Sequence, residues 1–325
     1  MTRFRSAARL LLWSALLLPI IGPARAETFP SRPIHLIMPY APGGIIDFTG
    51  RVVAQKLAEV LGQPVVAENR PGAGGIVGVD YVAHSDPDGY NIVIMDPAIV
   101  INPTLQKSMP YDIFKDLVTV SIVSSSPEVL VVTPALGVNT YAELVAYGKA
   151  NPGKLNYASA GVGTAPHLAA AMWVQRTGID AVHVPYKGVG PSFIDLVGGK
   201  VQMLFSSIAG ALPFTSKGSV IPLATTGTVR SPVYPNLPTL AEAGLPGYSV
   251  DLWLGVYTAA GIPPDALAKL NSGINQALQD NQLKIAFTKF GLTPRGTTLA
   301  EGAAFTKSEY DKWKKVVEDG HVTLD

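Results

Sequence analysis

A glycine pair at the start of a predicted helix is the first feature of this sequence that could bind a ligand. The apolar run "IHLIMPY" is followed by Gly43 and Gly44, and an amphipathic helix pattern with Asp47 in its first turn begins at once. Backbone N–H groups at a helix start favour anions, and glycines permit close approach. Asp47 would oppose a bound anion unless its carboxylate turns back to brace the loop. Taken alone, the stretch is more simply a tight turn between strand and helix.

A second glycine turn changes that balance. The stretch "LNYASAGVGTAPHL" again runs from a strand pattern through a glycine loop into a helix, with Ser159, Thr164 and His167 near the helix start. Two such helix starts, facing each other across a cleft, could hold one carboxylate through backbone donors and without a metal. This arrangement would also permit closure around the ligand. Two roles stay open for His167, which could contact the ligand or pack against the loop.

A third glycine cluster suggests a rival, a dinucleotide site. Gly72, Gly74 and Gly78 match a relaxed nucleotide-binding pattern, and Asp96 ends the next apolar run where a ribose-binding acid is expected. However, Arg70 and Pro71 separate these glycines from the preceding strand pattern. We therefore interpret the cluster as a tight turn with close helix packing.

The alternative function is an exported α/β enzyme of the hydrolase type. "YASAG" approaches the GxSxG pattern at Ser159, but Tyr157 stands where the first glycine is needed for the nucleophile turn. The five histidines are widely separated and show no metal-ligand spacing, so no metal or other cofactor is expected. A cleft lined by free backbone N–H groups would favour a receptor, whereas a nucleophile, base and acid brought together would favour the enzyme.

Export is predicted by the first 26 of the 325 residues. Arg3, Arg5 and Arg9 precede the apolar run "LLLWSALLLPIIG", and "ARA" ends at Ala26, which is the pattern of a cleaved signal peptide. A membrane anchor is less favoured because the run is shorter than the ~20 residues that span a bilayer. We expect cleavage after Ala26 and a periplasmic protein. With no cysteine, the chain has no disulfide and no lipid-modified cysteine as anchor.

Composition and pattern predict an α/β fold of two lobes. Hydrophobic residues make up 47% of the chain and charged residues 15%, and the basic stripe expected of a nucleic-acid-binding protein is absent. Strand and helix patterns alternate, as in parallel sheets. We expect lobe 1 at residues 27–127 plus 250–325, lobe 2 at residues 128–249, two crossover strands between them, and the ligand cleft between the lobes. A monomer is expected.

A series of motifs along the predicted mature chain resembles one family of transport receptors. The motifs are "FPSRPIHLIMPYAPGGIIDFTGR", "ENRPGAGGIVGVDYVAHSDPDGY", "SMPYDIFKDL", "NYASAGVGTAPHL", "VHVPYKG", "LVGGKVQMLF" and "YPNLPTLAEAGLPGY". Their order and spacing are similar to those of the substrate-binding receptors of tripartite tricarboxylate transporters, the TctC or Bordetella uptake gene (Bug) family.

The resemblance implies a periplasmic-binding-protein fold with mostly parallel sheets, which closes on a small organic carboxylate for the membrane components of such a transporter. It places two loops on the ligand, formed by Pro42, Gly43, Gly44, Ile45, Ile46 and Asp47, and by Ser159, Ala160, Gly161, Gly163, Thr164 and His167.

Departures from the family pattern bear on the identity of the ligand. Ile45 stands where the family often has a hydroxyl residue, and Ser206 stands where it often has an aspartate. The loss of an acid and a hydroxyl points away from amino acids and toward a less polar mono- or dicarboxylate, aromatic acids included. Tyr186, Ser206 and Ser207 are candidates for the far end of the ligand, and each could equally be structural.

Overall fold

The computed structural model describes residues 28–40, 42–186 and 188–319. The predicted signal peptide, residues 1–26, lies outside the described residues. None of the helices in the described ranges has the length and apolar character needed to cross a membrane.

Three strand–helix units open the chain, and the chain returns to them at its C-terminal end. We call this part the first half. It contains β1 (Ile34–Met38), α1 (Ile45–Leu61), β2 (Val65–Asn69), the 3-10 turn η1 (Ala73–Gly75), α2 (Ile76–Ala83), β3 (Asn91–Met95), α3 (Ala98–Leu105), α8 (Pro264–Ala277), α9 (Asn281–Lys289), β10 (Thr293–Pro294) and α10 (Leu299–Asp319).

A second strand–helix series forms the other half. It contains the 3-10 turn η2 (Pro134–Leu136), α4 (Tyr141–Ala150), β5 (Leu155–Ser159), α5 (Ala165–Thr177), β6 (Ala181–Pro185), α6 (Val189–Val197), β7 (Met203–Ser207), α7 (Ile208–Thr215) and β8 (Ile221–Thr225).

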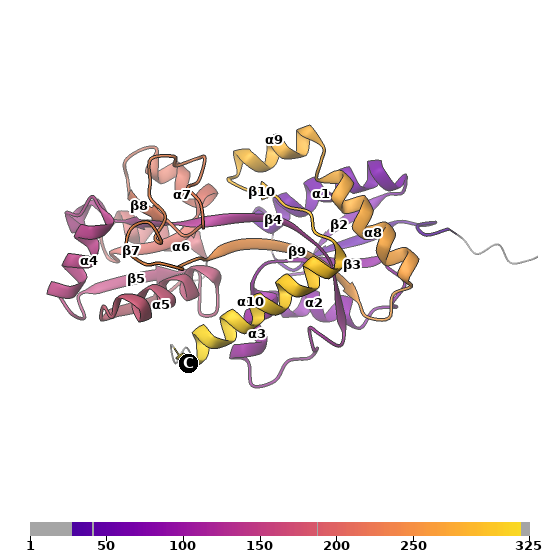
Figure 1. The fold of residues 1–325 in the computed structure, drawn as a ribbon, viewed down its shortest axis with the longest axis horizontal. Coiled ribbons are helices and arrows are strands. Elements are labelled where there is room, and N and C mark those ends of the chain that lie inside the picture. Colours follow the sequence, from indigo (N-terminus) through magenta and orange to yellow (C-terminus); the bar gives the residue numbers. More distant parts are fainter. Residues whose placement is uncertain (1–27, 41, 187, 320–325) are drawn as a thin grey trace, which may run out of the picture.

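Two long antiparallel strands link the halves, β4 (Leu117–Val132) and β9 (Asp251–Ala259). The strand order of the curled sheet is β2-β1-β3-β9-β4-β7-β5-β6, with β8 and β10 also paired to β4. Figure 1 shows β4 and β9 running side by side between the halves. Pairs within β1–β3 and within β5–β7 are parallel, whereas every antiparallel pair involves β4 or β9. The predicted α/β class is confirmed, and the lobe boundaries remain a prediction.

Helix ends follow the sequence where glycine marks them. α1 ends at Gly62 and α5 at Gly178, with φ of 69° and 66°, a left-handed conformation that suits glycine. The sequence pattern does not mark α3 and α7 as helices. Each contains an internal proline, Pro103 or Pro213, and neither has the polar face that marks an amphipathic helix.

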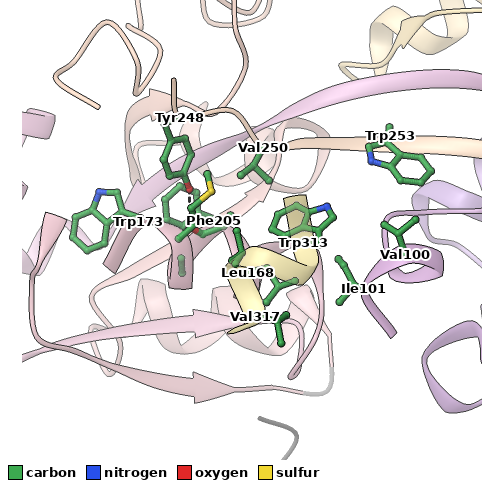
Figure 2. Packing of buried hydrophobic residues seen from close by; sticks show 14 of the residues in the cluster. Val100, Ile101, Leu168, Trp173, Phe205, Tyr248, Val250, Trp253, Trp313 and Val317 are labelled. Carbon is green, nitrogen blue, oxygen red and sulfur yellow. Dashed lines mark hydrogen bonds between the residues drawn. The ribbon is translucent and has the colours of Figure 1, made fainter. Parts of the chain in front are cut away.

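One apolar cluster reaches from the first half into the second. Figure 2 shows Trp313 and Val317 of α10 between Leu168 of α5 and Ile101 of α3. Trp313 and Leu168 are fully buried. The C-terminal helix therefore holds the two halves together through packing, in addition to the covalent links of β4 and β9.

Candidate functional site

The start of α1 has backbone donors and a carboxylate that braces its loop. The extended Gly44 precedes the helix and contributes no side-chain cap, so the N–H groups of the first turn are left without that partner. Asp47 turns back, and its Oδ2 accepts the N–H of Gly43 at 3.0 Å. Its Oδ1 accepts bonds from Arg51 and from Asn69, each at 3.0 Å. The hydrogen bond from Arg51 is the largest influence that lowers the pKa of Asp47, so this side chain is an engaged anion.

The start of α5 repeats this construction with a histidine in place of the acid. Thr164 precedes the helix without capping it, and its hydroxyl donates to the carbonyl of Gly161 at 2.7 Å. The N–H of Gly163 donates to Nδ1 of His167 at 3.1 Å. Nδ1 must be unprotonated to accept this bond. Burial, helped by the neighbouring His183, lowers the pKa of His167 to about 3, so the ring is neutral.

Ser159 and His183 lie together beneath the second loop. Oγ of Ser159 is 2.7 Å from Nε2 of His183, the distance of a nucleophile and its base. However, Ser159 is fully buried, and its hydroxyl also accepts the N–H of Gly161. Within the described part of the chain no hydrogen bond joins His183 to a carboxylate, and the ring instead stacks on His167 at 4.0 Å and on Tyr157 at 4.9 Å. The pair supports the loop.

Three other predicted residues have structural bonds. The phenol of Tyr186 donates to Asp195 at 2.8 Å. Ser206 is fully buried and its hydroxyl donates to the carbonyl of Ser207. Ser207 caps α7 by accepting the N–H of Gly210. These contacts favour the structural alternative for each of the three residues.

The remaining predicted residues divide between surface and core. Pro42, Gly43 and Gly44 are exposed. Ile46 is buried in the core of the first half, and the partly buried Ile45 packs against the same core. Both isoleucines can therefore offer the ligand their backbone N–H groups more readily than their side chains. In the second loop, the carbonyl of Ala160 accepts the N–H of Gly188.

Two close contacts join the halves near these loops. A Cβ atom placed on Gly163 would lie 2.8 Å from Cδ1 of Leu105, at the end of α3. A Cβ atom on Gly291 would lie 3.1 Å from Ile208, at the start of α7. The second glycine loop is thus pressed against a helix of the first half.

Sequence reasoning overlooked Tyr40 and Asn69 at the ends of two parallel strands. Asn69 is the last residue of β2 and donates from Nδ2 both to the carbonyl of Tyr40 and to Asp47. Arg51 completes this network by bonding to Asn69 at 2.8 Å. A polar residue at the carboxyl end of a parallel strand, beside a glycine loop, was the available signal.

The third glycine cluster packs as a structural turn. A Cβ atom on Gly78 would lie 2.6 Å from Cβ of Pro39, and one on Gly72 would lie 2.7 Å from Val77. Arg70 pairs with Glu68 and lies over the ring of Tyr81. Among the described residues, no three His, Asp or Glu side chains are grouped so that they could hold a metal ion.

Comparison with known proteins places this chain in one family. Residues 49–321 match the tripartite tricarboxylate transporter family receptor model. Protein BugT of Bordetella pertussis is 37% identical over 302 residues, which cover 92% of this chain and 93% of BugT. The chain belongs to the TctC family of periplasmic solute-binding receptors, as its motifs indicated.

Solved structures agree with this assignment. The periplasmic binding protein BugD superposes with a TM-score of 0.79 at 30% identity, covering 91% of this chain and 99% of BugD. Rpa4515 of R. palustris with adipate superposes with a TM-score of 0.82 at 31% identity, covering 91% of this chain and 99% of Rpa4515. MatC from Rhodopseudomonas palustris with bound malate superposes with a TM-score of 0.77 at 30% identity, covering 89% of this chain and 100% of MatC. The prediction of a receptor rather than an enzyme is confirmed by this membership.

Proposed function

We propose that this receptor captures a small organic carboxylate between the loops that precede α1 and α5, and delivers it to the membrane components of a tripartite tricarboxylate transporter. The observation that carries the proposal is the pair of helix starts without side-chain caps, each held open by a side chain of the helix itself. Adipate and malate in two related structures support a carboxylate as the ligand class.

The two braces resolve the objection that Asp47 would repel an anion. Its oxygens accept bonds from Gly43, Arg51 and Asn69, so its charge is compensated on the side of the loop. His167 is neutral and adds no charge. The N–H groups of residues 45–47, Ala165 and His167, together with the helix dipoles, then remain for a ligand carboxylate, whereas Pro166 has no N–H to offer.

Closure of two lobes is the second part of the proposal. We infer that residues 27–127 with 250–325 form one lobe and residues 128–249 the other, and that β4 and β9 flex as the lobes close on the ligand. The contact of Leu105 with Gly163 supports a closed arrangement, since it presses the second loop against the first half. Export to the periplasm with cleavage after Ala26 belongs to the same proposal.

The first test is thermal stability of the chain without residues 1–26 against a panel of acids. The panel contains citrate, four- to six-carbon dicarboxylates, acidic amino acids, and benzoate- and phthalate-type acids. A ligand that binds only the folded state adds about 2.7 kcal/mol at 100-fold over its Kd. A shift with one class of acid, and no chemical change in that acid, supports the proposal. No shift with any acid would contradict it.

A backbone substitution tests the helix start directly. Proline is tolerated at the first helical position and lacks the N–H group. Ile45→Pro removes a donor that Ile45→Ala retains, and the extended Gly44 before it suits a proline. We expect Kd about tenfold higher for Ile45→Pro than for Ile45→Ala, since a hydrogen bond to a charged group contributes about 1.5–3 kcal/mol.

A matched pair of variants controls for the proline itself. Asn281 is the exposed first residue of α9, where Asp280 caps the helix. Asn281→Pro and Asn281→Ala should bind the ligand equally. If Ile45→Pro and Ile45→Ala bind the ligand with equal affinity, the N–H of residue 45 does not contact the ligand.

A further inference from the structure

Asp96 lies at the same edge of the sheet as the first glycine loop. It directly follows β3, which is parallel to β1, and Tyr40 lies just beyond the end of β1. The carboxyl ends of parallel strands meet at one edge of a sheet, where ligands of open α/β folds bind.

Only one oxygen of Asp96 is engaged within the described part of the chain. Oδ1 accepts the N–H of Ala98 at 3.0 Å and the hydroxyl of Tyr40 at 3.2 Å. Oδ2 accepts no hydrogen bond from the described residues, and it is not among the enclosed side-chain atoms that lack a partner. Asp96 is half-buried, so its carboxylate is fixed in orientation by Oδ1, while Oδ2 is left without a partner among the described residues.

A short chain of hydrogen bonds connects this carboxylate to the brace of the first loop. The backbone carbonyl of Tyr40 accepts Nδ2 of Asn69 at 3.0 Å, and the same Nδ2 contacts Asp47 at 3.0 Å. The Tyr40 hydroxyl also contacts the carbonyl of Gly74 at 3.3 Å. Asp96 and the donors at the start of α1 are thus held on one rigid frame.

We propose that Oδ2 of Asp96 accepts a hydrogen bond from a hydroxyl or ammonium group that the ligand carries beside its carboxylate. This inference rests on the proposed function and narrows its ligand class to hydroxy- or amino-substituted dicarboxylates. An ionised acid at this place favours a ligand that presents such a donor over one that does not, because only the donor gives the charged oxygen a hydrogen bond. It differs from the sequence-based hypothesis of a less polar ligand, which rested on Ile45 and Ser206.

The charge state of Asp96 supports this role. Burial is the main cause that raises the pKa of Asp96 to about 6, against the opposing bonds from Ala98 and Tyr40. Tyr40 is the titratable side chain in contact with it among the described residues, and Tyr111 interacts electrostatically with Tyr40. Burial holds the pKa of Tyr40 well above its usual value, so that phenol stays neutral. Asp96 is mainly an anion at pH 7.5 and mainly neutral at pH 5.

Three acids that differ at one carbon provide the test. The first series has a four-carbon chain that carries hydrogen, hydroxyl or ammonium at C2, in succinate, malate and aspartate respectively. The second series is one carbon longer and consists of glutarate, 2-hydroxyglutarate and glutamate. Calorimetric titration at pH 7.5 should show the hydroxy or amino acid of one series binding at least tenfold more tightly than its unsubstituted parent. The better of the two distinguishes hydroxyl from ammonium.

Asp96→Asn is the decisive variant. Its amide oxygen can keep the bonds to Ala98 and Tyr40, while its NH₂ group presents a donor in place of Oδ2. We expect the preference over the unsubstituted acid to fall to within twofold or to reverse. Asp86→Asn, an exposed acid whose side chain makes no described bond, is the matched control and should retain the preference. The comparison of substituted and unsubstituted acids at pH 7.5 tests the same point on the unmodified protein if Asp96→Asn folds poorly.

Failure of this inference and failure of the receptor function are distinguishable. If unsubstituted, hydroxy and amino acids bind alike, or if Asp96→Asn keeps the preference, the role of Asp96 is overturned and the receptor function stands. The same holds if only an unsubstituted or aromatic acid binds. If no acid of either series or of the wider panel binds, the proposed function fails as well.

Discussion

The N–H of Gly163 donates to Nδ1 of His167, four residues further along the chain, and the start of α1 contains the same arrangement between Gly43 and Asp47. In both loops a side chain from the first turn of the helix holds the glycine that precedes the helix. The two loops thus reach one geometry with different chemistry, an anion in the first and a neutral imidazole in the second. This correspondence is the main structural argument that the loops act on a common ligand.

Removal of the first brace should affect both stability and binding. Asp47→Ala leaves Gly43, Arg51 and Asn69 without their shared acceptor. We expect a loss of about 1–3 kcal/mol in unfolding free energy and a Kd at least tenfold higher. Chemical denaturation and calorimetry measure the two effects. Asp311→Ala, which removes the exposed pair with Lys307, should cost less than about 1 kcal/mol and leave Kd unchanged.

The contact between Gly163 and Leu105 predicts a steric test of closure. Gly163 has φ of 77°, and a Cβ atom there would lie 2.8 Å from Leu105. Gly163→Ala should therefore lower the unfolding free energy by about 1–2 kcal/mol through backbone strain, and weaken ligand binding through the clash between the halves. Leu105→Ala in the same chain should restore the affinity but not the stability lost to strain. If the change in binding free energy of the double variant equals the sum of the changes in the two single variants, the contact does not influence binding.

The buried Glu128, on the linking strand β4, should make the unfolding free energy depend on pH. Burial, followed by repulsion from Asp251 on β9, raises the pKa of Glu128 to about 8, and its Oε2 is enclosed without a partner in the described chain. The folded state thus holds a proton that the unfolded chain releases near pH 4.3. The stability from this group is complete below about pH 4 and is lost as the pH rises toward 8.

Glu128→Gln should remove this dependence, because the amide is neutral at every pH. At pH 8.5 we expect the variant to be more stable than the unmodified protein by roughly 2–4 kcal/mol, and at pH 5 the two should be similar. Denaturation at pH 5, 7 and 8.5 measures the difference, with the exposed Glu318→Gln as control. An unmodified protein whose stability rises between pH 5 and 8.5 relative to Glu128→Gln would contradict the assignment.

A substitution at Tyr186 distinguishes a structural role of its hydroxyl from contact with the ligand. Its phenol donates to Asp195, which also pairs with Lys200. Tyr186→Phe should reduce the unfolding free energy by about 0.5–1.5 kcal/mol and leave Kd within twofold. A tenfold loss of affinity with unchanged stability would instead place the hydroxyl on the ligand.

Local sequence determined the elements and the two loops. Strand patterns, the glycine pair before Ile45 and the glycine loop before Ala165 specify backbone geometry over a few residues, so they could be read directly. The ends of α1 and α5 were predictable for the same reason, because a left-handed residue after a helix favours glycine. α3 and α7 escaped prediction because internal prolines and uniformly apolar faces obscure their periodicity.

Tertiary structure alone decided which side chains support the two loops and which lie beside them. Asp47 and His167 were visible in the sequence, but only the folded chain turns them back toward Gly43 and Gly163. Tyr40, Asn69 and Asp96 are far apart in sequence and meet because parallel pairing brings the ends of β1, β2 and β3 to one edge. Long-range pairing and burial create these contacts and shift the pKa values, and neither is encoded in a local pattern of residues.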